Sequence, residues 1–153
     1  MKTLQINEKN ARELYKTASP EFKQTLIDTF GADYFSENPI ETIKTFEDAC
    51  ETCGVLDTLI VSVTDTKDEG AYKKLKIIAR ALNQDWKANF NDGSQQKWYP
   101  WFVFNGSGFG FSGTDYAYSL TYAGVGSRLC FKSKELAEYA GKQFLSIYND
   151  YLL

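Results

Sequence analysis

The sequence predicts an α+β fold, in which a helical N-terminal part precedes a small antiparallel three-stranded meander flanked by helices. Three observations predict it. Apolar residues recur at helical spacing in the first part of the chain and on both sides of a central aromatic stretch. That stretch alternates with a period of two, as strands do. Glycine, asparagine and proline separate the segments. Such an order of elements is typical of an α+β domain.

Residues 1–54 are expected to form a helical N-terminal subdomain of three short helices. The first helix is predicted over Asn7–Lys16. Ser19 and Pro20 begin the second, because serine caps helix ends and proline suits the first helical position. The third is predicted to run from Pro39 to Cys53 on the spacing of its apolar residues.

Residues 55–153 are expected to form the α+β domain. Val55–Val63 is rich in β-branched residues and is either a short strand or a connector. Apolar residues at helical spacing predict a long helix over Asp68–Trp86 and a final helix over Ser133–Tyr151. Gly141 costs helix stability, so we expect it to mark a close approach to a neighbouring segment.

Three strands are expected between these two helices. Lys97–Phe104 is the first, at a sheet edge because it contains Pro100. Asp115–Ala123 alternates tyrosines with small residues and is the second, and Ser127–Phe131 is the third. Asn105–Thr114 is predicted to be a flexible hairpin loop, whose glycines either adopt positive φ or allow a close backbone approach.

Gly108–Gly113 matches the glycine spacing of nucleotide-binding loops. In dinucleotide-binding folds these glycines open a helix, whose N-terminus holds the phosphates. The segment that follows here alternates like a strand instead, and the catalytic motifs of kinases are missing from the sequence. We therefore predict a hairpin rather than a nucleotide site.

The composition limits the classes of function. The chain has no histidine, which excludes imidazole-based triads, imidazole general bases and histidine-ligated metals. The three cysteines do not suggest a disulfide framework, and one CxxC pair falls short of a zinc site. We expect no catalytic residues, no metal and no cofactor. A small histidine-free enzyme that uses a tyrosine or carboxylates is the second alternative, and its candidate carboxylates are Asp65, Asp68, Glu69 and Asp115.

Charge is distributed unevenly along the chain. Residues 1–70 hold 7 Lys and Arg against 14 Asp and Glu, a net −7, whereas residues 71–153 hold 10 against 6, a net +4. The basic half either attracts an anion such as nucleic acid or is an ordinary solvated surface. No apolar run approaches the ~18 residues that span a bilayer, and no signal-peptide pattern begins the chain. We expect no membrane association and an intracellular location.

The aromatic stretch contains most of the candidate binding residues. Tyrosines at strand spacing form either a platform on which bases or sugars stack, or the core face of a sheet packed on helices. Aromatic residues crowd both faces of the first strand, so we expect some of them to be exposed or in an interface. The candidate ligand-binding residues are Trp98, Trp101, Phe109, Phe111, Tyr116, Tyr118, Tyr122, Lys73, Lys76, Arg80 and Arg128.

Four segments resemble parts of an uncharacterised small protein family of phages, prophages and mobile elements of gut anaerobic bacteria: Glu13–Gly31, Ile43–Cys50, Lys97–Phe102 and Gly126–Phe144. The resemblance covers most of the chain and implies no activity and no catalytic residue. It implies an accessory role in the cytoplasm of a bacterial host cell. We expect a non-enzymatic binding or assembly module that contacts a protein partner or a second copy of itself. Single-stranded nucleic acid is the alternative ligand, held by stacking and by Lys and Arg contacts to phosphate.

Overall fold

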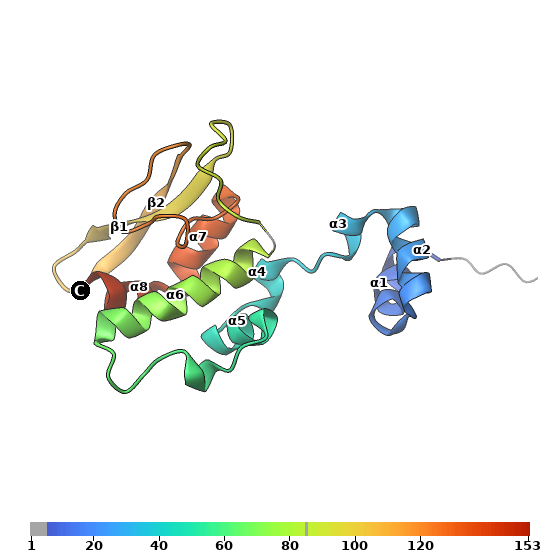
Figure 1. Ribbon diagram of the computed structural model, residues 1–153, viewed down its shortest axis with the longest axis horizontal. Coiled ribbons are helices and arrows are strands. Elements are labelled where there is room, and N and C mark those ends of the chain that lie inside the picture. The colour runs from blue at the N-terminus through green and yellow to red at the C-terminus, as the bar shows by residue number, and fades with distance from the viewer. Residues whose placement is uncertain (1–5, 85) are drawn as a thin grey trace, which may run out of the picture. The chain divides into compact units, whose positions relative to one another are not determined.

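The computed structural model describes residues 6–84 and 86–153, which divide into two compact units. The first unit ends at Asn38 and the second begins at Pro39. The helical subdomain was expected to extend to residue 54, whereas the segment from Pro39 to Cys53 belongs to the second unit. Figure 1 labels the helices and strands of each unit.

The described part of the first unit contains three helices, the first two of which have side-chain caps, including the one predicted at Ser19. The side chain of Asn7 accepts a hydrogen bond from the N–H of Asn10, and that of Ser19 accepts one from the N–H of Phe22. Each bond satisfies an N–H that lacks a partner inside the helix. The helices are α1 (Glu8–Thr17), α2 (Pro20–Phe30) and α3 (Ala32–Phe35).

The second unit contains the remaining helices. They are α4 (Pro39–Thr42), α5 (Phe46–Cys53), a short 3₁₀ turn η1 (Asp57–Leu59), α6 (Lys67–Asn83), α7 (Lys134–Gln143) and α8 (Leu145–Leu152). Helices are thus present on both sides of the hairpin in the sequence, as predicted: the long helix α6 before it, and α7 and α8 after it. Val55–Val63, for which a strand or a connector was expected, is a connector that includes η1.

Two helices that were predicted to be continuous are broken. Thr45 and Asp48 exchange hydrogen bonds between their side chains and backbone N–H groups, and this capping box starts α5 after α4 has ended. The final helix breaks at Phe144, whose φ of −108° and ψ of 27° separate α7 from α8. This break rotates the side chains of α8 relative to those of α7.

The sheet has two strands rather than the three that were predicted. β1 (Lys97–Phe104) pairs with β2 (Phe109–Ala117) in antiparallel orientation. The prediction of a third strand over Ser127–Phe131 is wrong: this segment forms turns and reaches β1 only where Phe131 bridges Trp98. The predicted second strand is also displaced, since β2 ends at Ala117 and the chain then leaves the sheet.

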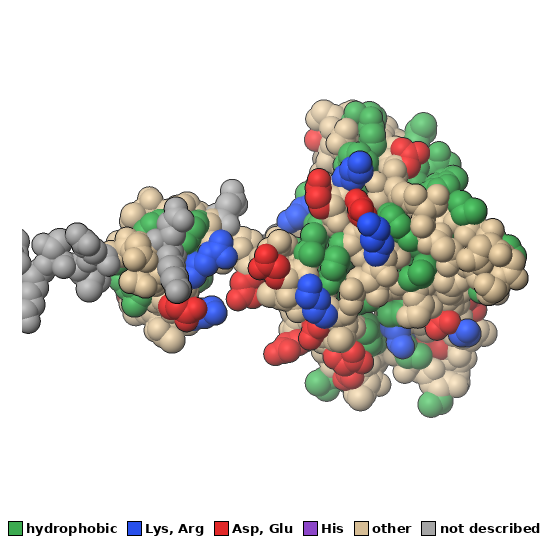
Figure 2. All heavy atoms as spheres, turned by 180° about the vertical axis from the view of Figure 1, so that it is seen from behind, with side chains coloured by type: hydrophobic (Ala, Val, Ile, Leu, Met, Phe, Trp, Pro, Cys, Tyr) green, Lys and Arg blue, Asp and Glu red, His purple; other side chains and the backbone are tan. Residues whose placement is uncertain are grey.

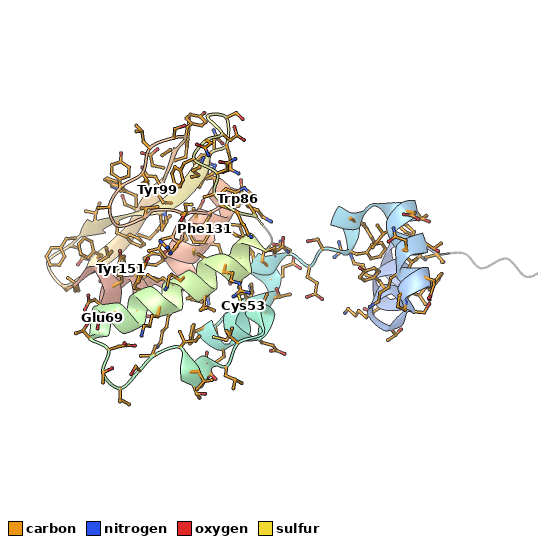
Figure 3. All side chains as sticks on the ribbon, in the orientation of Figure 1. Cys53, Glu69, Trp86, Tyr99, Phe131 and Tyr151 are labelled. Atoms are coloured by element: carbon orange, nitrogen blue, oxygen red, sulfur yellow. The ribbon has the colours of Figure 1, made fainter. Side chains whose placement is uncertain are left out.

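A turn takes the place of the third strand. Phe131 faces β1, so the next residue of this segment on the same side is Leu129, whose N–H donates instead to the C=O of Val125 at 3.2 Å. On the other side of the segment, the amide of the buried Asn83 donates to the C=O of Cys130 at 2.8 Å and accepts from the N–H of Lys132 at 2.9 Å. Figure 3 shows Phe131 between α6 and the hairpin. The end of α6 thus holds the segment that the sequence assigned to the sheet.

The glycine-rich segment is mostly strand, not the flexible loop predicted over Asn105–Thr114. The turn is closed by a hydrogen bond from the N–H of Asn105 to the C=O of Gly108, 3.0 Å. Only Gly106 within this turn has a positive φ, 93°. Ser112 is the extra residue of a bulge in β2.

Helices cover one face of the hairpin in successive layers. α7 contacts both strands and α8 contacts β2, while α6 packs on α7 and α8 and α5 packs on α6 (Figure 1). A Cβ on Gly141 of α7 would lie 2.6 Å from the Phe111 ring and 2.8 Å from Pro100 Cβ. The close approach expected at Gly141 is therefore confirmed, and the core lies between the hairpin and α6.

Candidate binding pocket at the edge of the hairpin

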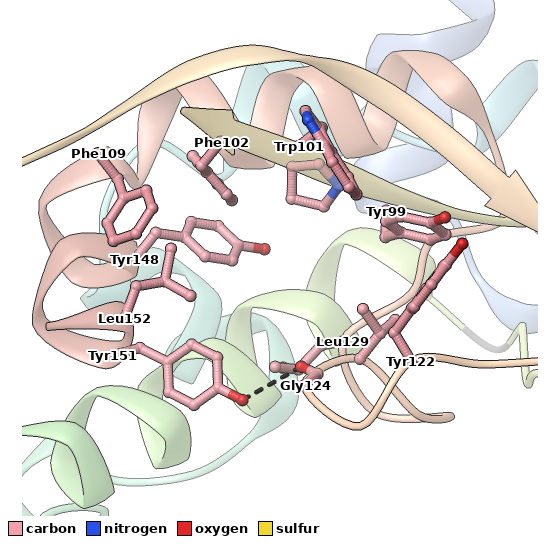
Figure 4. A pocket seen from close by; sticks show the side chains of 12 residues that line it. Tyr99, Trp101, Phe102, Phe109, Tyr122, Gly124, Leu129, Tyr148, Tyr151 and Leu152 are labelled. Carbon is pink, nitrogen blue, oxygen red and sulfur yellow. Dashed lines mark hydrogen bonds between the residues drawn. The ribbon is translucent and has the colours of Figure 1, made fainter. Parts of the chain in front are cut away.

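A pocket of about 240 Å³ lies beside β1, on the edge that faces away from β2 (Figure 4). Three parts of the chain enclose it: β1 with the start of β2, the segment that follows β2, and the last turns of α8. Its walls are almost entirely apolar or aromatic. The lining residues are Tyr99, Pro100, Trp101, Phe102, Phe109, Tyr122, Gly124, Val125, Leu129, Tyr148, Tyr151 and Leu152.

The missing third strand accounts for the position of this pocket. Trp98 and Phe131 exchange two backbone hydrogen bonds, 2.9 and 2.7 Å, and beyond that bridge no described residue continues the sheet on this side. Across the gap, the Tyr151 hydroxyl donates to the C=O of Gly124 at 3.1 Å (Figure 4). This bond joins α8 to the segment after β2 and so fixes two walls of the pocket relative to each other.

Tyr148 supplies the polar group of the pocket. Its side chain is only 4% exposed, and its ring lies 4.7 Å from that of Phe102. Figure 4 shows its hydroxyl pointing into the pocket, where it forms no hydrogen bond with any described residue. Burial raises the pKa of Tyr148 far above its ordinary value of 10.0, with a smaller contribution from Tyr151. The hydroxyl therefore stays protonated and can donate or accept a hydrogen bond.

Tyrosine and tryptophan side chains form the rim. Trp101 is 51% exposed and Tyr122 is 58% exposed. The Tyr122 ring packs edge-on against the buried ring of Tyr99, with 5.5 Å between centroids. Burial, followed by hydrogen bonding with Tyr122, raises the pKa of Tyr99. Asp115 contributes to this pKa shift as well, so one carboxylate lies beside the Tyr99 hydroxyl.

No Lys, Arg, Asp or Glu is among the described residues that line the pocket. The carboxylates named for a possible enzyme lie in separate places, and Asp115 accepts from the N–H of Tyr116 in β2 at 2.8 Å. Asp65 binds the Lys73 ammonium at 2.7 Å, which lowers the pKa of Asp65. Asp68 accepts from the hydroxyl of Thr66 and Glu69 from its N–H, at the start of α6. In the part of the chain that the structure describes, no group of three Asp, Glu or Cys residues could hold a metal ion.

The structure separates the predicted aromatic site residues into three places. Trp101, Phe109 and Tyr122 line the pocket. Trp98, Tyr116 and Tyr118 form a second cluster, with ring centroids 4.6 Å apart for the first pair and 5.4 Å for the second. Phe111 lies between β2 and α7, where it packs on Gly141.

The predicted cationic residues fall into two groups. Lys73 pairs with Asp65. Lys76, Arg80 and Arg128 line one groove of about 720 Å³, together with Lys87 and Trp86. No carboxylate is among the described lining residues of this groove. On the face that Figure 2 shows, acidic and basic side chains lie among one another without a large area of one sign.

Sequence reasoning missed the pocket residues on α8. Tyr151 was predicted as the end of a continuous final helix, and Tyr148 was not singled out. Phe144, Tyr148 and Tyr151 follow one another at spacings of four and three residues, which was the available signal. The break at Phe144 determines where the side chains of Tyr148 and Tyr151 point. No proline stands near Phe144, and no glycine near it has a positive φ, so the sequence did not indicate the break.

Comparisons of the chain with protein-family models, with curated proteins and with solved structures found no match. Among the helices of the described residues, none combines the length and the apolar character needed to cross a membrane.

Proposed function

We propose that the chain is a non-enzymatic binding module and that its ligand occupies the pocket beside β1. The supporting observation is the hydroxyl of Tyr148, a buried side chain that points into an apolar pocket without a partner among the described residues. The hydroxyl itself is reached by solvent through the pocket, since Thr114 Oγ1 is the fully buried side-chain atom without a partner among the described residues. A ligand that carries one polar group replaces this solvent and bonds the hydroxyl directly, as the few polar groups of apolar pockets do.

The lining defines the chemical class of the ligand. Aromatic walls favour an apolar or aromatic group, and one polar atom at the floor orients it. A charged group would lose its hydration without gaining an opposite charge, because no described lining residue is charged. The ligand is therefore an uncharged apolar or aromatic group with a hydrogen-bonding atom near the hydroxyl of Tyr148.

Binding of this kind suits an accessory protein that holds a partner and breaks no bonds. A protein partner is our first proposal for the source of the ligand. The resemblance to phage and mobile-element proteins and the location in the cytoplasm of a bacterial host cell stay predictions. Both are compatible with a module that works by contact alone.

An NMR titration of the ¹⁵N-labelled chain with p-cresol tests the proposal, since p-cresol has one ring and one hydroxyl. We expect shift changes at the amides of Phe102, Val125 and Leu152, which surround the pocket. Trp101→Ala should weaken binding because it removes a rim contact. Tyr139→Phe is the matched control, since the Tyr139 hydroxyl donates to the C=O of Ile43 elsewhere in the fold. The proposal would be contradicted if p-cresol caused no chemical-shift changes, or caused them only at amides away from the pocket.

Single-stranded nucleic acid is a second candidate ligand, at the groove of Lys76, Arg80 and Arg128. Its support is that Lys76 and Arg80, one turn apart on α6, and Arg128, which is far along the chain, line one groove next to Trp86. Cations that contact phosphates release counterions, so affinity falls steeply with salt, and tryptophan stacks on bases.

Fluorescence anisotropy of a labelled oligothymidine tests this second candidate. The double variant Arg80→Gln, Arg128→Gln should weaken binding at low salt and flatten its salt dependence. Lys142→Gln is the control, because Lys142 pairs with Glu138 outside the groove. Equal loss in both variants, or no binding at low salt, would exclude this ligand.

A further inference from the structure

The pocket lies along an edge of β1 that lacks a neighbouring strand. Asn105, the residue directly after β1, donates its N–H to the C=O of Gly108, the residue directly before β2. Near the other end, Trp98 bonds on the opposite side, to Phe131. Backbone groups of successive strand residues point to opposite sides. The odd-numbered residues of β1 therefore face β2, and the even-numbered residues face the pocket side.

The even-numbered residues beyond Trp98 are Pro100, Phe102 and Phe104. By this alternation, Phe102 and Phe104 present both N–H and C=O to the pocket side, and Pro100 presents its C=O. No hydrogen bond joins these groups to a described residue on that side. An unpaired edge of this kind is a template for another strand.

We propose that the ligand of the pocket is an extended peptide segment of a partner protein, which adds to β1 as the third strand of the sheet. This proposal rests on the proposed function and names its ligand class. Backbone hydrogen bonds to Phe102 and Phe104 provide affinity, and the aromatic pocket selects the side chains. Alternate side chains of the peptide enter the pocket, so its central residues are apolar at every second position and uncharged there.

The walls of the pocket favour a single peptide strand over a second copy of this chain. A strand added to β1 lies about 4.8 Å from it. At this edge α8 stands on one side with Tyr148 and Leu152, and the segment with Gly124 and Val125 stands on the other. A single strand needs only the space between these walls. The β1 edge of a second copy would bring its own α8 and its own segment after β2 into the same space.

The uncovered hydroxyl of Tyr148 also fits a peptide. A peptide offers a C=O or N–H at every residue, and those that do not face β1 point towards the far side of the added strand. Figure 4 shows the Tyr148 hydroxyl on the pocket floor, between the walls that α8 and β1 provide. A peptide therefore supplies the polar atom that the proposed function requires, without any charged group.

Short random peptides provide the probe. They are selected on the chain and counter-selected on the Trp101→Glu variant, which places a charge at the rim of the pocket. We expect enriched sequences with apolar residues at alternate positions. The proposal is overturned if the unchanged chain enriches no peptide sequences, or if the enriched sequences lack this alternation.

N-methylation of each backbone nitrogen in turn, in one selected peptide, tests the strand pairing itself. We expect N-methylation at every second position to weaken binding about tenfold, because the peptide loses an N–H bond to β1 there. N-methylation at the positions between these should change the affinity little. Hydrogen exchange supplies a second measurement: the peptide should protect the amides of Phe102 and Phe104 and leave those of Trp101 and Val103 unchanged. Binding without the alternating pattern, or protection elsewhere, overturns strand addition.

These outcomes distinguish this proposal from the proposed function. If p-cresol binds in the pocket but no selected peptide shows the alternating pattern, the pocket is a ligand site and strand addition is wrong. If p-cresol does not bind there either, the proposed function fails as well. A dimer whose β1 amides become protected without any peptide would show that a second copy occupies the edge, which also contradicts the proposal.

Discussion

Asn149 of α8 holds Phe109, the first residue of β2, by both ends of its side-chain amide. The N–H of Phe109 donates to Asn149 Oδ1 at 2.7 Å, and Asn149 Nδ2 donates to the C=O of Phe109 at 2.9 Å. The adjacent Gly108 leaves room for this contact, because a Cβ there would lie 2.9 Å from Asn149 Oδ1. The pair joins the hairpin to the helix that provides the opposite wall of the pocket, so the pocket is formed before a ligand arrives.

We therefore expect Asn149→Ala to lower the free energy of unfolding by about 1–3 kcal/mol, since it leaves two backbone groups of Phe109 without a partner. It should also weaken p-cresol binding. Urea denaturation measures the first effect and the NMR titration the second. Asn91→Ala serves as the control, because Asn91 is exposed in a turn. Equal stability of the two variants would show that the amide contact does not hold the hairpin.

Gly141→Ala should destabilise the fold although alanine favours helices. The added methyl group meets Phe111 and Pro100 at 2.6–2.8 Å, and overpacking of this kind costs about 1–3 kcal/mol. That cost exceeds the gain of about 1 kcal/mol in helix propensity. Gly113→Ala is the matched control in the strand, where nothing lies within 4 Å of a new Cβ. A rise in the midpoint of thermal unfolding for Gly141→Ala would contradict the packing described here.

Asn83→Asp should destabilise the protein almost as much as Asn83→Ala. The carboxylate keeps the shape of the side chain but cannot donate to the C=O of Cys130, and it would be buried. We expect a loss of about 2–4 kcal/mol in the free energy of unfolding for either variant. Asn83→Ala leaves the C=O of Cys130 and the N–H of Lys132 without this partner, whereas Asn83→Asp leaves the C=O of Cys130 unpaired and buries a charge. Chemical denaturation measures the loss. An unaffected Asn83→Asp variant would mean that the acceptor bond to Lys132 alone holds this segment.

The thiol of Cys130 should make stability depend on alkaline pH. Burial raises the pKa of Cys130 from its ordinary value of 9.0 to about 11. Below pH 9 the thiol is protonated in both states, so its contribution is fully present. Between pH 9 and 11 the unfolded chain loses the proton and the folded chain keeps it, so stability falls as pH rises.

The size of this effect follows from the two pKa values. The difference corresponds to about 2 kcal/mol of stability lost across this pH range. The Cys130→Ala variant should lack this loss, so the stability difference between the unchanged chain and the variant should shrink from pH 9 to pH 11. Urea denaturation over this pH range checks it. A difference that stays constant with pH would show that the thiol ionises equally in both states.

Local signals in the sequence predicted much of the helical structure. Ser19 and Pro20 start α2, Ser133 caps α7, and the apolar stripe of α6 was evident from its spacing. These features depend on neighbours within one or two turns. The α+β class and the place of the hairpin's first strand followed from them and from the period-two alternation.

The elements that sequence reasoning missed depend on contacts between distant residues. Asn83 and Cys130 are 47 residues apart, and their hydrogen bond holds the segment before α7 at the end of α6. The pocket exists because α8 and β1 face each other across the resulting gap. The candidate residues Trp101 and Tyr122 were found from their aromatic clustering, but their common place beside Tyr148 depends on the tertiary fold.

The most direct test of the account is the coupling between the Tyr148 hydroxyl and the hydroxyl of the ligand. The affinities of p-cresol and toluene are measured for the unchanged chain and for Tyr148→Phe, which gives a double cycle. We predict that p-cresol binds more tightly than toluene to the unchanged chain and that Tyr148→Phe removes this preference, a coupling of about 1 kcal/mol. Equal preference for p-cresol in both proteins, or no binding of either compound, would contradict the claim that this pocket is a ligand site with Tyr148 as its polar contact.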